Sequence, residues 1–180
     1  MQALVILADG SEEIEAVTVI DILRRGGINT ISASLFSGPV RASRGVVLLA
    51  DALLDEAMKT SCDLLVLPGG AEGTEAMSKD ERVLAKVREQ NAQRKWLAAI
   101  CAAPKVLAKA GVLAGKHVTS YPGALEGARN NLYEESPVVV DGHIVTSRGP
   151  GTAMDFALTL VELLAGRSCR EEVETRLMRP

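Results

Sequence analysis

Three short apolar runs without polar interruptions predict strands that are buried on both faces. They lie at residues 3–8, 64–67 and 96–100. Runs of this kind are typical of parallel strands that helices cover on both sides, whereas half-exposed strands alternate apolar and polar residues. The pattern therefore predicts a parallel central sheet.

Helical periodicity fills the segments between and after these runs. In residues 12–25 it is carried by four apolar residues, Ile14, Val17, Ile20 and Leu23. This segment ends at two glycines, a common C-terminal signal. We expect further helices at residues 80–94, 103–110, 152–165 and 168–179. Because strand and helix patterns alternate along the chain, the fold class is α/β, a doubly wound, mostly parallel sheet sandwiched by helices.

Two segments predict hairpins. Residues 31–49 contain a Gly-Pro and an Arg-Gly pair between short β-prone pieces, which favours an excursion at one sheet edge. Residues 138–140 and 144–146 flank an Asp-Gly pair, a strong hairpin signal. Neither a repeat nor a linker interrupts the 180 residues, so we expect one domain over residues 1–180.

The composition is that of an ordinary globular domain, with 47% hydrophobic and 24% charged residues. The formal net charge is −3, and lysine and arginine are scattered, so no nucleic-acid partner is expected. No apolar run is long enough to span a bilayer, and no basic segment precedes the first one. We therefore expect neither a membrane anchor nor a signal peptide.

The three cysteines are widely spaced and form no CxxC pair. This number and spacing argue against a disulfide framework and against a zinc site. We therefore expect a reducing, cytoplasmic setting and no bound metal.

Cys101 lies where a predicted strand runs directly into a predicted helix, among small residues. A sharp turn of this kind is typical of a nucleophile elbow, and Pro104 suits the first turn of the helix that follows. The positive end of that helix is expected to lower the pKa of the thiol and favour the thiolate. The alternative is a small buried hydrophobic residue, as most free cysteines are. The spacing leaves both open, whereas Cys62 and Cys169 lack this context.

Glu15 heads an apolar stripe, since Val19 and Ile22 follow it by four and seven residues. A carboxylate in that position is desolvated, which raises its pKa and keeps it protonated near neutrality. A neutral carboxylic acid donates a hydrogen bond to a thiolate and then serves as acid and base. The alternative is a first-turn carboxylate that only complements the helix dipole, the role we assign to Glu12 and Glu13.

Gly69 and Gly70 follow the predicted strand at residues 64–67. The carboxyl end of a parallel strand is where ligands bind in open α/β sheets, and two glycines there leave backbone N–H groups accessible. A plain turn is the alternative. The sequence does not form GxGxxG, so it supports no dinucleotide, and we expect no cofactor.

Five short motifs follow one another along the chain: ADGSEEIE at 8–15, SRGV at 43–46, LPGG at 67–70, AICAAP at 99–104 and TSRGPGT at 146–152. In these motifs the chain resembles the ThiJ/PfpI superfamily, most closely its parkinsonism-associated protein deglycase branch and the bacterial relatives of that branch. The resemblance covers nearly the whole chain. It implies a flavodoxin-like sandwich with a nucleophile elbow, and a homodimer with two equivalent sites near the interface.

The resemblance also implies roles for individual residues. Cys101 is the reactive cysteine and Glu15 the protonated glutamate beside it. The N–H groups of Gly70 and Ala102, with Gly69 adjacent, form the oxyanion pocket.

Further positions carry over from the same resemblance. Arg44 reaches the neighbouring subunit's site region, and Arg25 and Pro150 lie near the same pocket, in the substrate pocket or at the interface. Tyr121 departs from the pattern, because relatives can carry histidine there. A cysteine–histidine–acid arrangement therefore lacks its base, which argues against a peptidase.

Two function hypotheses share this site. The first is a cofactor-independent enzyme of the glyoxalase III or protein deglycase type, in the hydro-lyase or hydrolase class. It acts on methylglyoxal-like dicarbonyls, free or as early adducts on amines and thiols. The alternative, also implied by the resemblance, is an oxidative-stress sensor and redox-regulated chaperone that uses Cys101. A thiamine-pathway enzyme has less support, since no phosphate-binding loop is found.

Overall fold

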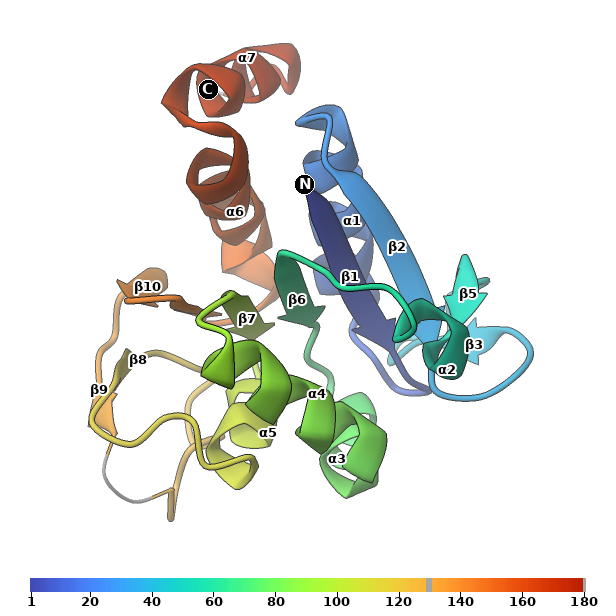
Figure 1. Cartoon of the computed structure of the whole chain (residues 1–180). Helices are drawn as coiled ribbons and strands as arrows, with labels where there is room; N and C mark the ends of the chain where they lie inside the picture. Colours follow the sequence, from blue (N-terminus) through green and yellow to red (C-terminus); the bar gives the residue numbers. More distant parts are fainter. Residues whose placement is uncertain (129–130, 180) are drawn as a thin grey trace.

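A seven-stranded sheet forms the centre of the protein in a computed structural model that describes residues 1–128 and 131–179 (Figure 1). Its strands are β1 (Gln2–Leu7), β2 (Asn29–Ser34), β5 (Ala52–Leu53), β6 (Leu64–Leu67), β7 (Trp96–Ile100), β10 (Val138–Asp141) and β11 (Ile144–Ser147). They are arranged in the order β10-β11-β7-β6-β1-β2-β5. Every pair is parallel except the β10–β11 hairpin, so the predicted sheet is confirmed.

The side chains of β1 show why the apolar runs are continuous. Leu4 and Ile6 pack into one core, and Ala3, Val5 and Leu7 pack into the other, on the opposite face of the sheet. Successive side chains point to opposite faces of a strand, so a strand that is covered twice needs apolar residues at every position.

Helices cover both faces of the sheet (Figure 1). One layer contains α1 (Glu13–Arg25), α6 (Ala153–Ala165) and α7 (Arg167–Arg176). The other contains α2 (Leu54–Ala57), α3 (Ala71–Lys79), α4 (Glu81–Ala92) and α5 (Pro104–Lys109). A single 3-10 turn, η1 (Pro150–Thr152), precedes α6. The five helices expected from periodicity are confirmed, whereas α2 and α3 were not expected.

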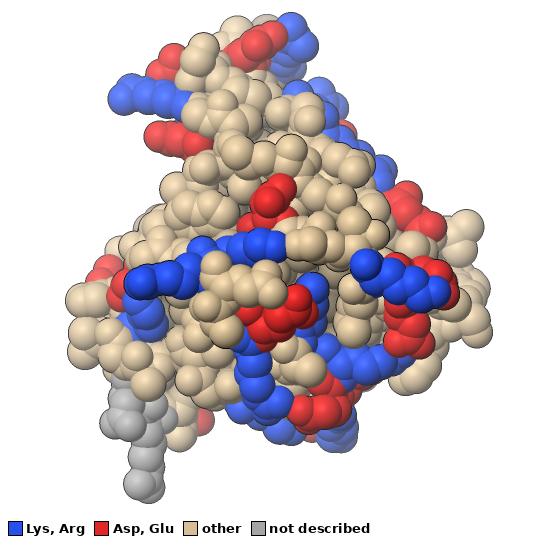
Figure 2. All heavy atoms as spheres, viewed as in Figure 1, with Lys and Arg blue, Asp and Glu red and all other residues tan. Residues whose placement is uncertain are grey.

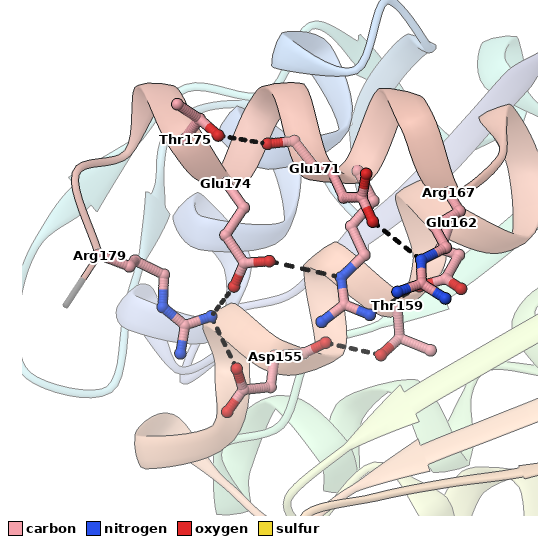
Figure 3. A network of polar contacts seen from close by, with 9 residues as sticks. Asp155, Thr159, Glu162, Arg167, Glu171, Glu174, Thr175 and Arg179 are labelled. Atoms are coloured by element: carbon pink, nitrogen blue, oxygen red, sulfur yellow. Dashed lines mark hydrogen bonds and ion pairs between the residues drawn. The ribbon is translucent and has the colours of Figure 1, made fainter.

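Helix α7 is fastened to α6 by ion pairs around Arg179 (Figure 3). The guanidinium lies 2.7 Å from Asp155 and 3.2 Å from Glu174. Val173 is buried, and Leu177 packs against the same core. Exposed ion pairs contribute little stability individually, so the apolar contacts anchor the helix and the charges orient it.

The buried face of α1 differs from the predicted one. Ile14 and Val17 are 55% and 47% exposed, whereas Glu15, Val19 and Ile22 are buried. The stripe headed by Glu15 therefore faces the core. Of the predicted stripe, Ile14 and Val17 stay on the surface of the chain, whereas Leu23 is buried in the core and Ile20 packs against it.

The edge excursion expected at residues 31–49 begins later than predicted. Residues 31–34 belong to β2, which pairs in parallel with β1 inside the main sheet. The antiparallel hairpin consists of β3 (Val40–Arg41) and β4 (Val47–Leu48). The two turn signals mark only the hairpin, and the prediction extended them to residues 31–34, which belong to a strand between β1 and β5.

The remaining strands, β8 (His117–Val118) and β9 (Leu132–Tyr133), form a small parallel pair. Within residues 1–128 and 131–179, no helix combines the length and the apolar character needed to cross a bilayer. Acidic and basic side chains are interspersed over the face shown in Figure 2.

Candidate active site

The candidate site lies at the carboxyl ends of β1, β6 and β7. The chain proceeds from β1 to β2 on one side, and β6 later pairs with β1 on the other side. At β1, successive strands along the chain therefore stop being added on one side of the sheet and begin to be added on the other. Such a switch point is where open α/β sheets bind ligands. Three turns leave these strands, and they bring together residues 8–12, Gly69-Gly70 and Cys101.

Cys101 occupies the sharp turn after β7. Its φ is +63°, a left-handed conformation that costs a non-glycine residue about 1–3 kcal/mol. Main-chain hydrogen bonds hold it there, since its N–H donates to the Ser147 carbonyl (3.0 Å) and its carbonyl accepts from the Tyr121 N–H (2.8 Å). Helix α5 begins at Pro104. The predicted elbow is therefore confirmed.

Glu15 lies below the cysteine and is fully buried. Its Oε2 accepts a hydrogen bond from the Gly69 N–H at 2.7 Å, while Oε1 is buried without a partner of hydrogen-bonding geometry among the described residues. Burial raises the pKa of Glu15 to about 7, against smaller opposing effects of the Gly69 N–H and the Cys101 thiol. The raised pKa expected from the stripe pattern is confirmed.

The pKa of Cys101 changes in the direction opposite to the sequence expectation. Burial first, and then the charge and hydrogen bonding of Glu15, raise it to about 12, although the N–H groups of Gly70 and Ala102 lower it. Helix α5 is only six residues long, so its dipole is too small to outweigh burial beside a carboxylate.

These two groups titrate as a pair. The charge of Glu15 raises the thiol pKa only while Glu15 is ionised, so a proton on either group stabilises the anion of the other. Glu15 is the first of the two to lose its proton, near pH 7, and the Cys101 sulfur keeps its own. Just above neutrality the pair is thus a carboxylate beside a thiol, and one internal proton transfer would convert it to an acid beside a thiolate.

Close backbone approach explains the two glycines. A Cβ on Gly69 would lie 2.6 Å from the Cys101 Cβ and 2.8 Å from the Glu15 Oε2. Gly70 has a φ of +88°, and a Cβ there would lie 2.1 Å from the Gly10 carbonyl oxygen. No side chain fits at either position, so the glycines do more than form a turn.

A cavity of about 850 Å³ opens above the Cys101 sulfur. Cys101 itself is only 9% exposed. Of the predicted site residues, six line it: Arg44, Gly70, Cys101, Ala102, Tyr121 and Pro150. Glu15 and Gly69 lie directly below, in contact with Cys101. The other lining residues include charged side chains that we did not predict: Asp9, Glu12, Arg41 and Glu72.

Arg25 does not line the cavity at Cys101 of its own chain, and its place at an interface between subunits stays a prediction. It pairs with Asp21 at 2.6 Å at the far end of α1 and borders a separate hollow that includes Gly26 and Cys169. Ten residues of helix separate it from Glu15, which corresponds to about 15 Å along the axis.

The profile of the DJ-1/PfpI family matches residues 1–163. The chain belongs to the DJ-1/PfpI family. The superfamily resemblance drawn from the five motifs is therefore confirmed.

Individual DJ-1 relatives match over different shares of their length. Protein dj-1beta of Drosophila melanogaster is 45% identical over 179 residues, which cover 98% of this chain and 96% of that protein. The Glutathione-independent glyoxalase DJR-1.2 of Caenorhabditis elegans is 32% identical over 168 residues, covering 91% and 89% respectively. Protein DJ-1 homolog B of Arabidopsis thaliana is 46% identical over 168 residues, 92% of this chain, and the chain spans only 38% of that relative.

Solved structures of DJ-1 proteins show the same flavodoxin-like α/β fold. The crystal structure of Drosophila DJ-1beta superposes with a TM-score of 0.95 at 44% identity and covers 99% of this chain and 98% of that chain. The oxidized DJ-1 of Toxoplasma gondii gives a TM-score of 0.94 at 37% identity, with coverages of 98% and 97%.

Sequence reasoning missed what Glu13 does in this DJ-1/PfpI protein. Its carboxylate accepts hydrogen bonds from the Ser43 hydroxyl (2.8 Å) and the Arg44 N–H (2.8 Å) and so attaches the β3–β4 hairpin to α1. Burial opposes ionisation, but these hydrogen bonds outweigh it and hold the pKa of Glu13 below its usual value. No local pattern reports a contact over about 30 residues, so the dipole role was all that the sequence indicated.

Tyr121 and the two histidines define how this DJ-1/PfpI site differs from a peptidase. Tyr121 is 54% exposed at the cavity wall. His117 instead contacts Glu134, and His143 contacts Asn91. Neither histidine lines the described cavity, so neither is placed to act as a base for Cys101.

Proposed function

We propose that this DJ-1/PfpI protein is a cofactor-independent glyoxalase or protein deglycase. Its substrates are methylglyoxal-like dicarbonyls, free or as early adducts on amines and thiols. The observation that carries the proposal is the pairing of a strained, cavity-lining Cys101 with a buried Glu15 that has a pKa of about 7. The name of the nematode relative, a glutathione-independent glyoxalase, supports it.

The first step joins sulfur to the substrate aldehyde. As the Cys101 sulfur bonds to the aldehyde carbon, the thiol proton moves to the Glu15 carboxylate, and the carbonyl π electrons move to oxygen. The N–H groups of Gly70 and Ala102, which already point at the sulfur, stabilise that oxyanion. Glu15 then returns the proton to the oxyanion, which gives a neutral hemithioacetal.

The second step moves hydrogen between the two substrate carbons. The Glu15 carboxylate removes the proton from the carbon bonded to sulfur, and the electron pair moves to the second carbonyl oxygen, which gives an enediolate. Glu15 delivers that proton to the neighbouring carbon, while the hydroxyl proton on the first carbon ends on the second oxygen. The product is a thioester on Cys101, and water releases a hydroxyacid such as lactate. Tyr121 donates a hydrogen bond from the cavity wall to a substrate oxygen.

The test is turnover of methylglyoxal to lactate by the reduced protein. Replacement of Cys101 by serine or of Glu15 by glutamine is expected to lower the rate at least about a hundredfold, because each removes a group that acts in the transition state. The matched control is Cys62→Ser, which removes a buried thiol hydrogen-bonded to Gln90 outside the cavity. If both Cys101→Ser and Glu15→Gln continue to consume the dicarbonyl, the mechanism is wrong.

A second candidate function, an oxidative-stress sensor with redox-regulated chaperone activity, uses the same residues. The observation that favours it is the ring of donors around the sulfur, since Gly70, Ala102 and neutral Glu15 can also bind the oxygens of an oxidised cysteine. After mild peroxide, mass spectrometry is expected to find added oxygen chiefly on Cys101. Preferential oxidation of Cys62 or Cys169 contradicts this function.

We also propose a homodimer, built on the exposed apolar residues of α1. Ile14 and Val17 lie on the helix to which Glu13 attaches the β3–β4 hairpin, and that hairpin exposes Val46 and Val47. An apolar surface of this kind beside a cavity is typical of an interface. In the dimer, Arg44 reaches the neighbouring subunit's site region.

Light scattering after size exclusion tests the dimer. Val17→Glu is expected to convert it to a monomer, because a charge would be buried in the interface. Val140→Glu, on an exposed position of β10, is the control and leaves the mass unchanged. A monomeric wild-type protein overturns the proposal.

A further inference from the structure

Glu12 connects the two turns that surround the Cys101–Glu15 pair. Its Oε2 accepts a hydrogen bond from the Glu15 N–H at 2.8 Å, and its own N–H donates to the Gly69 carbonyl at 3.0 Å. Gly69 in turn donates its N–H to the Glu15 carboxyl at 2.7 Å. The three hydrogen bonds form a closed ring that fixes the start of α1 against the turn after β6.

The residue type at this position is informative. Glu12 is the N-cap of α1, a position where serine, threonine, aspartate and asparagine are preferred. A shorter side chain forms the same cap with less loss of side-chain entropy. Glu12 is only 9% exposed, and it lines the cavity. Its carboxylate therefore acts within the site as well as on the helix end.

Besides burial, three groups shift the pKa of Glu15. The turn after β7 contributes the Cys101 thiol, the turn after β6 contributes the Gly69 N–H, and α1 contributes the Glu12 carboxylate. The Glu13 carboxylate is occupied by Ser43 and Arg44 on the hairpin. Burial raises the pKa of Glu15 most, and the charge of Glu12 raises it further.

We propose that Glu12 is a positioning residue that holds Glu15 against Gly69 and, by its negative charge, favours the protonated form of Glu15. The hydrogen bonds fix where the Glu15 carboxyl lies, and the negative charge disfavours a second carboxylate beside it. The catalytic consequence rests on the proposed role of the pair. The effect of Glu12 on the protonation of Glu15 is independent of that proposed role.

The decisive variant is Glu12→Gln, because the amide oxygen still accepts the Glu15 N–H while the charge is lost. Infrared spectroscopy follows the carbonyl stretch of protonated Glu15 as the pH rises, and the Glu15→Gln variant identifies the band. In Glu12→Gln the midpoint of this titration is expected to fall by about half a unit to one unit, the effect of removing one nearby like charge. The low-pH limb of the rate of Cys101 alkylation by iodoacetamide is expected to move by the same amount.

Two further variants separate charge from structure. Glu12→Ala removes both cap and charge, so it is expected to show the same titration shift with a lower melting temperature. Glu72→Gln removes another carboxylate that lines the cavity without a hydrogen bond to Glu15 and is expected to leave the Glu15 midpoint in place. An unchanged midpoint in Glu12→Gln, or an equal shift in Glu72→Gln, overturns the inference.

The experiment also distinguishes this inference from the proposed enzyme activity. Neither the infrared titration nor the alkylation requires a dicarbonyl substrate. A protein that shows the shift but does not turn over methylglyoxal supports the role of Glu12 and contradicts the glyoxalase. A protein that turns over methylglyoxal but shows no shift in Glu12→Gln supports the glyoxalase and contradicts the role of Glu12.

Discussion

Replacement of Gly69 by alanine is the most direct probe of the site, because it adds one methyl group between the two reactive side chains. Gly69 does not have a positive φ, so alanine introduces no backbone strain of its own. The added Cβ would lie 2.6 Å from the Cys101 Cβ and 2.8 Å from the Glu15 Oε2. It would also lie 2.9 Å from the Ile100 carbonyl oxygen.

All three contacts are shorter than carbon contacts allow, and the neighbours have little freedom to move. Cys101 is held by main-chain bonds on both sides, and Ile100 belongs to β7. The Glu15 carboxyl is the group that must shift, and its hydrogen bond to the Gly69 N–H is then lost. Overpacking of this kind typically costs about 1–3 kcal/mol. In a domain of this size, each kcal/mol lowers the melting temperature by about 2–4 °C.

The assay combines thermal unfolding with methylglyoxal turnover. Gly69→Ala is expected to lower the melting temperature by about 2–12 °C. It is also expected to lower turnover by about a hundredfold, since a displacement of about 1 Å suffices for such a loss. Gly151→Ala is the control, because Gly151 has neither a positive φ nor any atom within 4 Å of the added Cβ. A Gly69→Ala protein with wild-type stability and turnover refutes the reasoning.

Three further predictions concern single residues. The unfolded chain releases the Glu15 proton near pH 4.5 and the folded chain near pH 7, so the folded state binds more protons in this window and the free energy of unfolding falls as pH rises. The fall is about 3 kcal/mol, and urea unfolding at the two ends of the window is expected to show it in the wild type but not in Glu15→Gln. Arg25→Ala breaks an exposed pair with Asp21 far from the site, so kcat/KM is expected to stay unchanged; a tenfold loss would place Arg25 in the mechanism after all. Tyr121→Phe keeps the backbone contact to Cys101 and is expected to lower kcat/KM by roughly threefold to tenfold, the effect of one neutral hydrogen bond, whereas an unchanged value excludes the hydroxyl from substrate binding.

The sequence predicted the covered strands and most helices because their patterns arise from local burial. Residues 64–67 and 96–100 were located to the residue, since apolar runs between turns have few alternatives. Residues 31–34 were misplaced because turn signals farther along the segment do not show where the preceding strand of the sheet ends. On α1 the periodicity allowed two apolar stripes. The choice between them depends on which surface the sheet offers, which is a property of the assembled fold.

The candidate site was predictable where small residues and glycines mark close approach. Cys101 and Gly70 were identified in this way, whereas Glu15 was identified because it heads an apolar stripe. The direction of the Cys101 pKa was not predicted, because it depends on burial and on the carboxylate 86 positions earlier in the sequence. The backbone bond from the Glu12 N–H to the Gly69 carbonyl was missed for a related reason, since it joins two turns that are distant in the sequence.

The two main-chain bonds that hold Cys101 have a consequence for how such a site changes during evolution. The amide of Cys101 continues the ladder between β7 and β11, and its carbonyl is fixed by the backbone of residue 121. Neither bond depends on which side chains its partners carry. Mutation can therefore exchange the ring at position 121 and alter what the hollow accepts, while the sulfur keeps its place.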